Sequence, residues 1–322
     1  TGISSFLTTL PTSEIEGLIK PQFEKFGINV NPDKFAELLE DVRAVSSSMV
    51  MQTQATQNKA FEVVGITLTK RLLMKKGLLK DSFIIPIDLH KELFENLDSQ
   101  NKERADSIVV NIDAESKRIN MMVVEIKCRQ SLTDSEEENL EEKMVGQVNN
   151  TIEAMEEHFG NSTSIYTSSN RLDKELTTME LRNLLSFYIK RAQRYGLLSQ
   201  DVSEEYLHFL NDLGSDDYEI EYKRMGIIFN LGQNVKQIKT PYGDATIYKM
   251  GRPVIEDILS SDKSLDTFHL DAEDQEFINE FPKSSRRESR IPEVAVKPAP
   301  RKPESVHDVK DIDIPSVTFP KK

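Results

Sequence analysis

The stretch that decides the fold is DSIVVNIDAESKRINMMVVEIK, residues 106–127. Two runs rich in β-branched and other apolar residues, 107–112 and 119–127, flank the turn-prone residues 113–117. Runs of this composition on either side of a polar turn are typical of two antiparallel strands joined as a hairpin. We therefore predict a β-hairpin near the centre of the chain.

Helical patterns surround this hairpin. Apolar residues recur with the 3.6-residue period of an amphipathic helix over 58–76, and Gly77 provides a stop. Pro86 indicates an edge strand or a strand end, because proline has no N–H to donate. Helices and strands that alternate in this way predict an α/β fold. The other expected elements are helices at 32–42, 136–159, 178–195 and 202–213, strands at 83–87, 164–166 and 225–231, and a final hairpin that turns at 242–244.

The composition restricts the class of protein. The chain has 322 residues, of which 41 are basic and 54 acidic, with a formal net charge of −13. Such acidity argues against a nonspecific nucleic-acid coat, so a polyanion site must be a local basic patch or a metal site. The single cysteine, Cys128, excludes an internal disulfide framework and a cysteine-rich zinc site. No apolar run would span a membrane and no secretory signal opens the chain, so a cytoplasmic protein is expected.

Composition also divides the chain into regions. We predict a helical region over 1–57, an α/β domain with a helical insertion over 58–250, and an acidic extension over 251–281. Residues 282–322 hold seven of the thirteen prolines and ten basic against six acidic residues. This composition predicts a disordered linker, and a segment that folds on binding is the alternative.

Three charged residues lie where the predicted hairpin opens. Asp106 precedes the first strand, and Glu125 and Lys127 lie near the end of the second. Residues i and i+2 of a strand face the same side, so Glu125 and Lys127 share a surface while Ile126 faces the other way. Antiparallel pairing would set Asp106 beside Glu125, and two carboxylates with the Ile126 carbonyl between them would suit Mg²⁺. Ordinary surface charges at strand ends are the alternative.

The pattern Asp…Glu-x-Lys across a hairpin resembles the PD-(D/E)xK nuclease superfamily, particularly its RecB-like and archaeal-resolvase-like branches. These branches carry an acid on the helix before the hairpin and often a Gln on the helix after the motif strand. In this chain Glu62 lies on the helix before the hairpin and Gln147 on the helix after it. The sequence departs from the family at Ala105, where a Pro is usual, and at Thr151, where many RecB-like members carry an aromatic residue.

The resemblance implies a restriction-endonuclease-like core, in which helices flank a mixed central sheet. It implies a metal-dependent deoxyribonuclease, an endonuclease or exonuclease that hydrolyses phosphodiester bonds. The implied ligands of one or two Mg²⁺ ions, for which Mn²⁺ would substitute, are Asp106, Glu125 and the Ile126 carbonyl, with Glu62 completing the shell. Lys127 would orient the attacking water and help to deprotonate it.

The remaining implied roles concern the substrate. Gln147 would position water or phosphate, and Arg129 would contact DNA close to the metal. A basic group on the helix 178–195 would hold the phosphate backbone, or else form an ordinary solvated helix face: Lys190, Arg191 and Arg194. A second basic group, on the helix 58–76, has the same two interpretations: Lys70, Arg71, Lys75 and Lys76.

Two further segments, 84–90 and 187–197, are similar to nuclease-like segments attached to HerA-type ATPases in prokaryotic DNA-defence proteins, such as phosphorothioate-dependent restriction systems. The chain has no GxxxxGK(S/T) loop, so the ATPase would be a separate subunit or fused domain. The implied partners are thus DNA and a HerA-type ATPase, without a membrane, and an oligomer is possible. A nuclease-fold module that binds or assembles without cutting is one alternative, and a structural adaptor is another.

Overall fold

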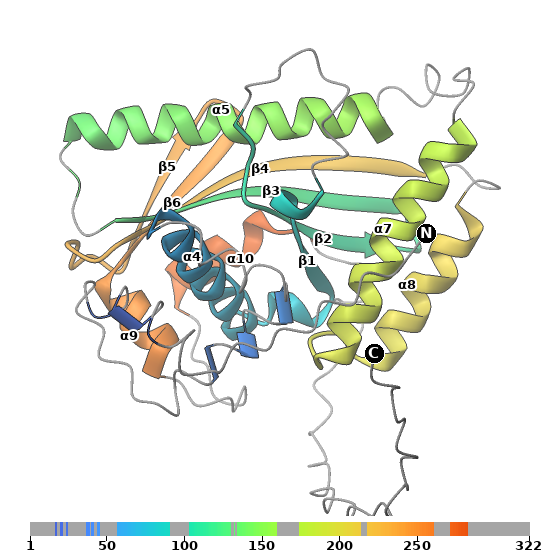
Figure 1. Cartoon of the computed structure of the whole chain (residues 1–322), viewed down its shortest axis with the longest axis horizontal. Coiled ribbons are helices and arrows are strands. Elements are labelled where there is room, and N and C mark those ends of the chain that lie inside the picture. The colour runs from blue at the N-terminus through green and yellow to red at the C-terminus, as the bar shows by residue number, and fades with distance from the viewer. Residues whose placement is uncertain are drawn as a thin grey trace, which may run out of the picture. The chain divides into compact units, whose positions relative to one another are not determined.

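The computed structural model describes residues 57–90, 103–129, 134–159, 174–213, 218–260 and 271–282, together with Leu132 and single positions between 17 and 45. Its centre is a six-stranded sheet with the order β1-β2-β3-β4-β6-β5 (Figure 1). The strands are β1 (Ser82–Pro86), β2 (Ser107–Asp113), β3 (Arg118–Arg129), β4 (Glu219–Asn230), β5 (Gln237–Tyr242) and β6 (Ala245–Gly251). The helices are α4 (Gln57–Lys75), α5 (Asp134–Phe159), α7 (Lys174–Arg194), α8 (Gln200–Asp212), α9 (Arg252–Ser260) and α10 (Ala272–Glu280), with the short 3-10 helices η1 (Leu78–Lys80) and η2 (Ile87–Leu89).

The predicted central hairpin is present and consists of β2 and β3. Its register pairs Ser107 with Val124. β1 pairs antiparallel with the other side of β2, which makes β1 an edge strand that ends at Pro86, as predicted. One residue beyond the paired region, the same register sets Asp106 opposite Glu125. The hairpin therefore brings together the two acids that are far apart in the sequence.

The middle of the sheet is parallel. β3 and β4 run side by side from Arg118 opposite Glu219 to Arg129 opposite Asn230. Parallel neighbours cannot be joined by a tight turn, and here the connecting chain contains α5, α7 and α8. β4 pairs parallel with β6, and β6 forms an antiparallel hairpin with β5 around Gly243, whose φ is 58°. The sheet is therefore mixed, with antiparallel pairs at both sides of a parallel centre.

Helices cover both faces of this sheet. On one face α4 packs against β3, and α9 and α10 belong to the same apolar cluster as alternate residues of β3, such as Val124 and Ile126. On the other face α5 packs against β3, and the intervening residues of β3, such as Met121 and Val123, belong to one apolar cluster with residues of α5, α7 and α8. Figure 1 shows α5 running along β3 and β4, with α7 and α8 next to each other. The apolar core thus forms two layers, and β3 is buried between them.

The predicted α/β class is confirmed, with a mixed sheet flanked by helices. The four helices predicted within the described ranges correspond to α4, α5, α7 and α8, and the strands and hairpins there are also found. Some expected elements lie outside the described residues: most of the helix at 32–42, the strand at 164–166, and the linker beyond 282.

The described parts of the predicted acidic extension, 251–260 and 271–281, contribute to the core. α9 contributes Ile255 and α10 contributes Phe277 to the apolar layer that contains α4. The Phe277 ring packs edge-to-face against Tyr248 of β6, with 4.9 Å between ring centroids. Apolar residues on one face of each short helix explain this packing. Asp257 and Glu273 remain exposed, whereas the buried Asp274 is paired with Lys76 and Lys236.

Helix α4 approaches β3 closely at Gly65. A Cβ atom at this position would lie 2.9 Å from Ile126 Cγ2 and 3.3 Å from Cys128 Sγ. Both neighbours are buried, and the β-branched Ile126 has little rotamer freedom. By contrast, a Cβ atom at Gly146 of α5 would have no atom within 4 Å. Only the first glycine is therefore needed for packing.

We predict that alanine at these two glycines has opposite effects on stability. Gly65→Ala should lower the free energy of unfolding by about 1–3 kcal/mol, because overpacking displaces α4 from β3. Gly146→Ala should raise it by about 0.5–1 kcal/mol, because alanine is the better helix former. Urea denaturation followed by circular dichroism measures both changes. Equal effects of the two substitutions would contradict the close packing at Gly65.

Candidate active site

Asp106, Glu125 and Lys127 come together where β2 begins. The Ile126 N–H donates a hydrogen bond to Asp106 Oδ2 at 2.7 Å. The carboxylate oxygen takes the position that a backbone carbonyl would occupy if the β2–β3 pairing continued. Glu125 Oε1 forms an ion pair with Lys127 Nζ. The structure thus brings two carboxylates and one ammonium group into contact.

The Ile126 carbonyl faces the same gap as the Asp106 carboxylate. The N–H and C=O of one residue in an antiparallel strand point toward the same neighbouring strand. The Ile126 N–H is directed at Asp106. The carbonyl oxygen of Ile126 therefore points to the same side, into the space before the first residue of β2. Carboxylate and carbonyl oxygens are the ligands that Mg²⁺ prefers in proteins. The predicted oxygen donors therefore lie at one edge of the sheet.

Glu125 is completely buried, with an exposed fraction of 0%. Burial raises the pKa of Glu125 well above its ordinary value of 4.5, the Asp106 carboxylate raises it further, and Lys127 opposes both effects. Apart from the ion pair with Lys127, its two oxygens accept no hydrogen bond of normal geometry from the described residues. A buried acid without hydrogen-bond donors is costly unless it is neutralised or binds a cation.

Lys127 remains positively charged at neutral pH. Burial lowers the pKa of Lys127, but Glu125 and Asp106 outweigh burial and raise it above its ordinary value of 10.5. An ammonium group donates hydrogen bonds but cannot accept a proton from water. The arrangement therefore favours an orienting role for Lys127 over the expected help in deprotonating water.

Side chains of α5 hold the segment that leads into β2. Thr151 Oγ1 accepts a hydrogen bond from the buried Ala105 N–H at 2.8 Å and donates one to the Gln147 carbonyl at 2.9 Å. Gln147 Nε2 donates to the Arg104 carbonyl at 3.0 Å, and Asn150 makes a third bond of this kind. Sequence reasoning missed Thr151 as a structural residue and noted it only as a departure from the family pattern. Its signal was a hydroxyl one helical turn after Gln147.

Gln147 faces the same side of the sheet as Glu125, because α5 packs on that face. Its Oε1 is buried and has no hydrogen-bond partner among the described residues. Gln147 Nε2 thus anchors the backbone just before Asp106 through its hydrogen bond to the Arg104 carbonyl. Gln147 Oε1 has no donor among the described residues. Its action on water or phosphate stays a prediction.

Glu62 does not join the two acids as a third metal ligand. It lies one turn before Gly65 on α4, which packs against Ile126 and Cys128 on the opposite face from Glu125. Glu62 is also not among the groups that shift the pKa of Glu125. Within the described ranges no three His, Cys, Asp or Glu side chains are placed to hold a metal ion.

The expected DNA-binding residues differ in their surroundings. Arg129 shares a face of β3 with Lys127, and its Nη1 donates to the Cys128 carbonyl at 2.9 Å. Arg191 Nε donates to the carbonyls of residues 44 and 45, at 3.0 and 3.2 Å, so Arg191 holds the N-terminal region rather than an open surface. Lys190 and Arg194 are exposed.

The basic residues of α4 form ion pairs within the protein. Lys70, only 3% exposed, pairs with Asp41 at 2.7 Å, and Arg71 bonds to the same carboxylate. Lys75 pairs with Asp257 and Lys76 with Asp274. These pairs connect α4 to the N-terminal region and to the C-terminal helices. The expectation that this group lines a DNA channel is therefore not supported by its contacts.

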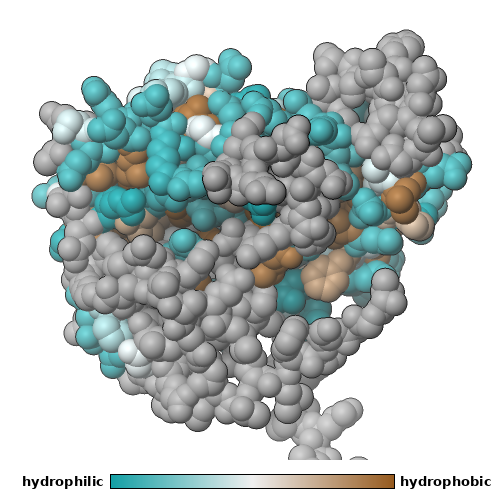
Figure 2. Space-filling view, turned by 45° about the horizontal axis from the view of Figure 1, so that its top comes forward, coloured by the Kyte–Doolittle hydropathy of each residue, from teal (hydrophilic) through white to brown (hydrophobic). Residues whose placement is uncertain are grey.

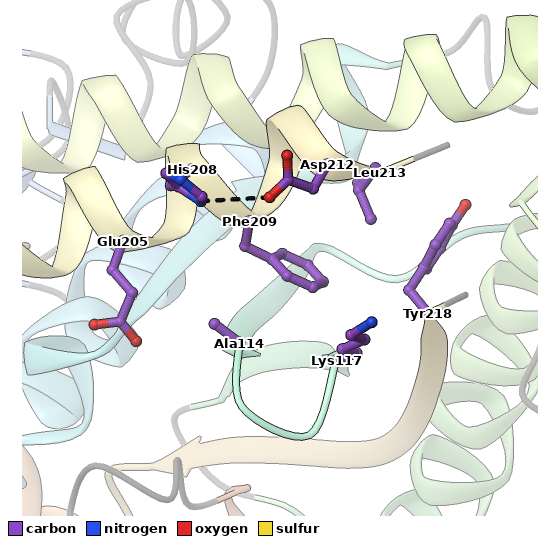
Figure 3. Close-up of a pocket in the computed structure, with 8 residues that line it drawn as sticks. All are labelled: Ala114, Lys117, Glu205, His208, Phe209, Asp212, Leu213 and Tyr218. Atoms are coloured by element: carbon purple, nitrogen blue, oxygen red, sulfur yellow. Dashed lines mark ion pairs between the residues drawn. The ribbon is translucent and has the colours of Figure 1, made fainter. Parts of the chain in front are cut away.

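A cavity of about 230 Å³ lies at the opposite, closed end of the β2–β3 hairpin (Figure 3). Figure 3 shows Phe209 of α8 directed toward Ala114 and Lys117 of the hairpin turn. An ion pair between His208 and Asp212, 3.4 Å long, lies on α8 beside it. The length of β2 separates this cavity from Asp106, so the cavity is not part of the candidate active site.

No family model, no curated protein and no solved structure matches the chain. The fold and the site define the class as an α/β protein with a mixed six-stranded sheet and a buried carboxylate pair beside a lysine. None of the helices in the described ranges has the length and apolar character that crossing a bilayer requires.

We predict that Thr151→Val destabilises the protein although valine has nearly the same shape. The buried Ala105 N–H would lose its acceptor, which costs about 1–3 kcal/mol. Thr151→Ser keeps the hydroxyl and serves as the control. Chemical denaturation of both variants measures the difference. A larger loss for serine than for valine would show that the methyl group, and not the hydrogen bond, is what matters.

We also predict a pH-dependent effect of Glu125→Gln, measured in EDTA. Because the pKa of Glu125 is raised on folding, the stability that its protonated form contributes is complete below its ordinary pKa of 4.5 and is lost as pH rises through the folded pKa. The free energy of unfolding of the wild type should therefore fall with rising pH relative to that of the variant. Glu138→Gln, at an exposed position of α5, should follow the wild type. Parallel curves for all three proteins would contradict a raised pKa.

Proposed function

We propose that the chain is a metal-dependent nuclease of the PD-(D/E)xK type that hydrolyses phosphodiester bonds in DNA. The observation that carries this proposal is the contact of Asp106, Glu125 and Lys127 around a fully buried acid. The order of elements supports it, since α4 with Glu62 precedes the hairpin and α5 with Gln147 follows it. This is the order in which the superfamily carries its site residues.

The residues present fit a divalent cation such as Mg²⁺ or Mn²⁺. The Asp106 and Glu125 carboxylates and the Ile126 carbonyl would hold it, and among the described residues only Lys127 is paired with the Glu125 oxygens. A bound cation would lower the pKa of its water ligand and offset negative charge on the phosphate. Because a cation binds the ionised carboxylate and burial raises the pKa of Glu125, metal binding should become tighter as pH rises.

The side chains around this position have separate tasks. The Ile126 N–H fixes the Asp106 carboxylate, and the bonds from α5 fix the backbone before it. Lys127 donates hydrogen bonds to the attacking water or to a phosphate oxygen, where its charge stabilises the transition state. Gln147 Oε1 accepts a hydrogen bond from water and so helps to aim it.

The proposed setting is prokaryotic DNA defence in the cytoplasm, together with a HerA-type ATPase. The support is the resemblance of segments 84–90 and 187–197 to nuclease-like segments of such proteins. The two segments contact each other, since His90 Nε2 and the Tyr188 hydroxyl lie 2.8 Å apart. The first segment also contacts the site, because the Ile87 N–H donates to the Asp106 carbonyl at 3.1 Å.

A second candidate is a module of the same fold that binds or assembles without cutting. One observation favours it: in the described part of the chain, Asp106 and Glu125 have no third acid or His beside them as a metal ligand. Lys127 also holds Glu125 in an ion pair that a cation would have to displace. Metal binding and cleavage distinguish the two candidates.

We predict that the chain cleaves plasmid or linear DNA with Mg²⁺ or Mn²⁺. Asp106→Ala and Lys127→Met should lower the rate by about 10²-fold or more, because they remove a ligand and a charge that stabilises the transition state. Lys80→Ala, at an exposed position of η1, is the matched control and should cut like the wild type.

Calorimetric titration with Mg²⁺ and Mn²⁺ completes this test. Binding that Asp106→Ala abolishes, without any cleavage, would favour the module that does not cut. If no cation binds and no DNA is cut, the proposed nuclease is rejected.

A further inference from the structure

One exposed face of α7 carries aromatic and basic side chains near its C-terminal end. Residues 187, 190 and 194 follow the helical spacing of three and four, and Tyr195 comes directly after the helix. Phe187 is 57% exposed and Tyr195 41%, and both cations are exposed as well. In Figure 2 hydrophobic side chains reach the surface among hydrophilic ones on the right, on the side where α7 lies in Figure 1. We name the group Phe187, Lys190, Arg194 and Tyr195 the α7 strip.

The charge of this region is opposite to that of the whole chain. Residues 181–200 contain four basic and no acidic residues, whereas the chain has a net charge of −13. Among the residues that the structure describes, Lys190 and Arg194 take part in no ion pair, in contrast to the basic residues of α4. Two solvent-accessible cations on an acidic protein are complementary to a polyanion.

The two aromatic rings of the strip are supported by the protein on one side. The Phe187 ring packs edge-to-face against Tyr188, with 5.0 Å between centroids and an angle of 86°. The Arg191 guanidinium lies over the Tyr195 ring at 5.2 Å from its centroid, and Arg191 is itself fixed by backbone carbonyls. Large exposed rings that are held in this way offer surfaces on which planar groups can stack.

The helix that carries the strip is connected to the candidate active site. Tyr188, next to Phe187, contacts His90 at the end of η2. At the start of η2 the Ile87 N–H donates to the carbonyl of Asp106. The strip is thus joined to the Asp106 end of the hairpin by a short chain of contacts, and α7 packs against β1 there.

We propose that the α7 strip binds single-stranded nucleic acid and leads it to the Asp106–Glu125 site. Bases stack on Phe187 and Tyr195, and Lys190 and Arg194 pair with phosphates. Paired bases in a duplex cannot present their faces to such rings, so the strip selects unpaired strands. The binding stands on the strip alone. The statement that a single strand or single-stranded end is the substrate rests on the proposed function.

Fluorescence anisotropy tests this proposal with the full chain in EDTA, so that cleavage cannot occur. The probes are a labelled 20-nucleotide oligo-dT and a labelled duplex of the same length. Phe187→Ala should weaken oligo-dT binding about 5- to 150-fold, the range expected for one base–aromatic stack. Phe187→Tyr should retain binding. Leu176→Ala is the matched control, since Leu176 is 53% exposed on the same helix but lies outside the strip.

Salt dependence provides a second measurement. Lys190→Gln and Arg194→Gln should each remove one contact between a cation and a phosphate. For each lost contact, the slope of log Kd against log salt concentration for oligo-dT should decrease by about 0.7. Equal affinity for duplex and oligo-dT, or no effect of Phe187→Ala, would overturn the proposal. Self-association of the chain is a third outcome that would overturn the proposal. If sedimentation shows self-association that Phe187→Ala abolishes, and oligo-dT does not bind, the strip binds a second copy of the chain instead.

The outcome for the strip is separable from that for the nuclease. Lys80→Ala should leave oligo-dT affinity in EDTA unchanged, since Lys80 belongs neither to the strip nor to the candidate active site. Binding that depends on Phe187, together with no cation binding and no cleavage, supports the strip and rejects the nuclease. If Phe187→Ala changes the cleavage rate neither on single strands nor on duplex, the result supports the nuclease and rejects the strip.

Discussion

The site depends on the register of β2 against β3 and on the position at which that pairing ends. Beyond Ser107 the ladder stops, and the Ile126 N–H has no strand carbonyl to bond with. The Asp106 carboxylate takes the place of that carbonyl. The Ile126 N–H needs an acceptor, and this hydrogen bond therefore also fixes an acid at the edge of the sheet. Glu125 then lies directly across from it. A shift of register by one residue would turn Glu125 and Lys127 to the face of α4.

The second determinant is the burial of Glu125 on the α5 face. β3 lies between two helical layers, so every side chain in its middle is enclosed, whatever its charge. An ionised carboxylate there requires compensation, which the Lys127 ammonium group supplies in part, and burial raises the pKa of Glu125 and so favours its protonated form. The same environment would favour a divalent cation over the proton, because the cation brings more positive charge to the same oxygens. The arrangement is thus stable without metal and still suited to binding one.

Local sequence patterns were sufficient for the hairpin, for Pro86 at a strand end, and for the shared face of Glu125 and Lys127, because strand alternation and turn composition are properties of neighbouring residues. They were insufficient for contacts between distant segments. The pairing of Lys70 with Asp41, the bonds of Arg191 to the N-terminal region, and the packing of α10 under α4 all depend on the folded arrangement. For the same reason the sequence placed Glu62 on the correct helix, but could not show on which face of the sheet that helix packs.

The long connection between β3 and β4 has a consequence for the order in which the protein folds. Residues that pair across this ladder are about a hundred positions apart, whereas the β2–β3 hairpin closes over a turn of a few residues. Short loops close sooner than long ones, since they lose less chain entropy. The acids at 106 and 125 therefore meet early in folding, while the layer that encloses them arrives late. In the interval both are hydrated and accessible to cations in the surrounding solution, so a divalent ion has a route to this position that does not require the finished protein to open.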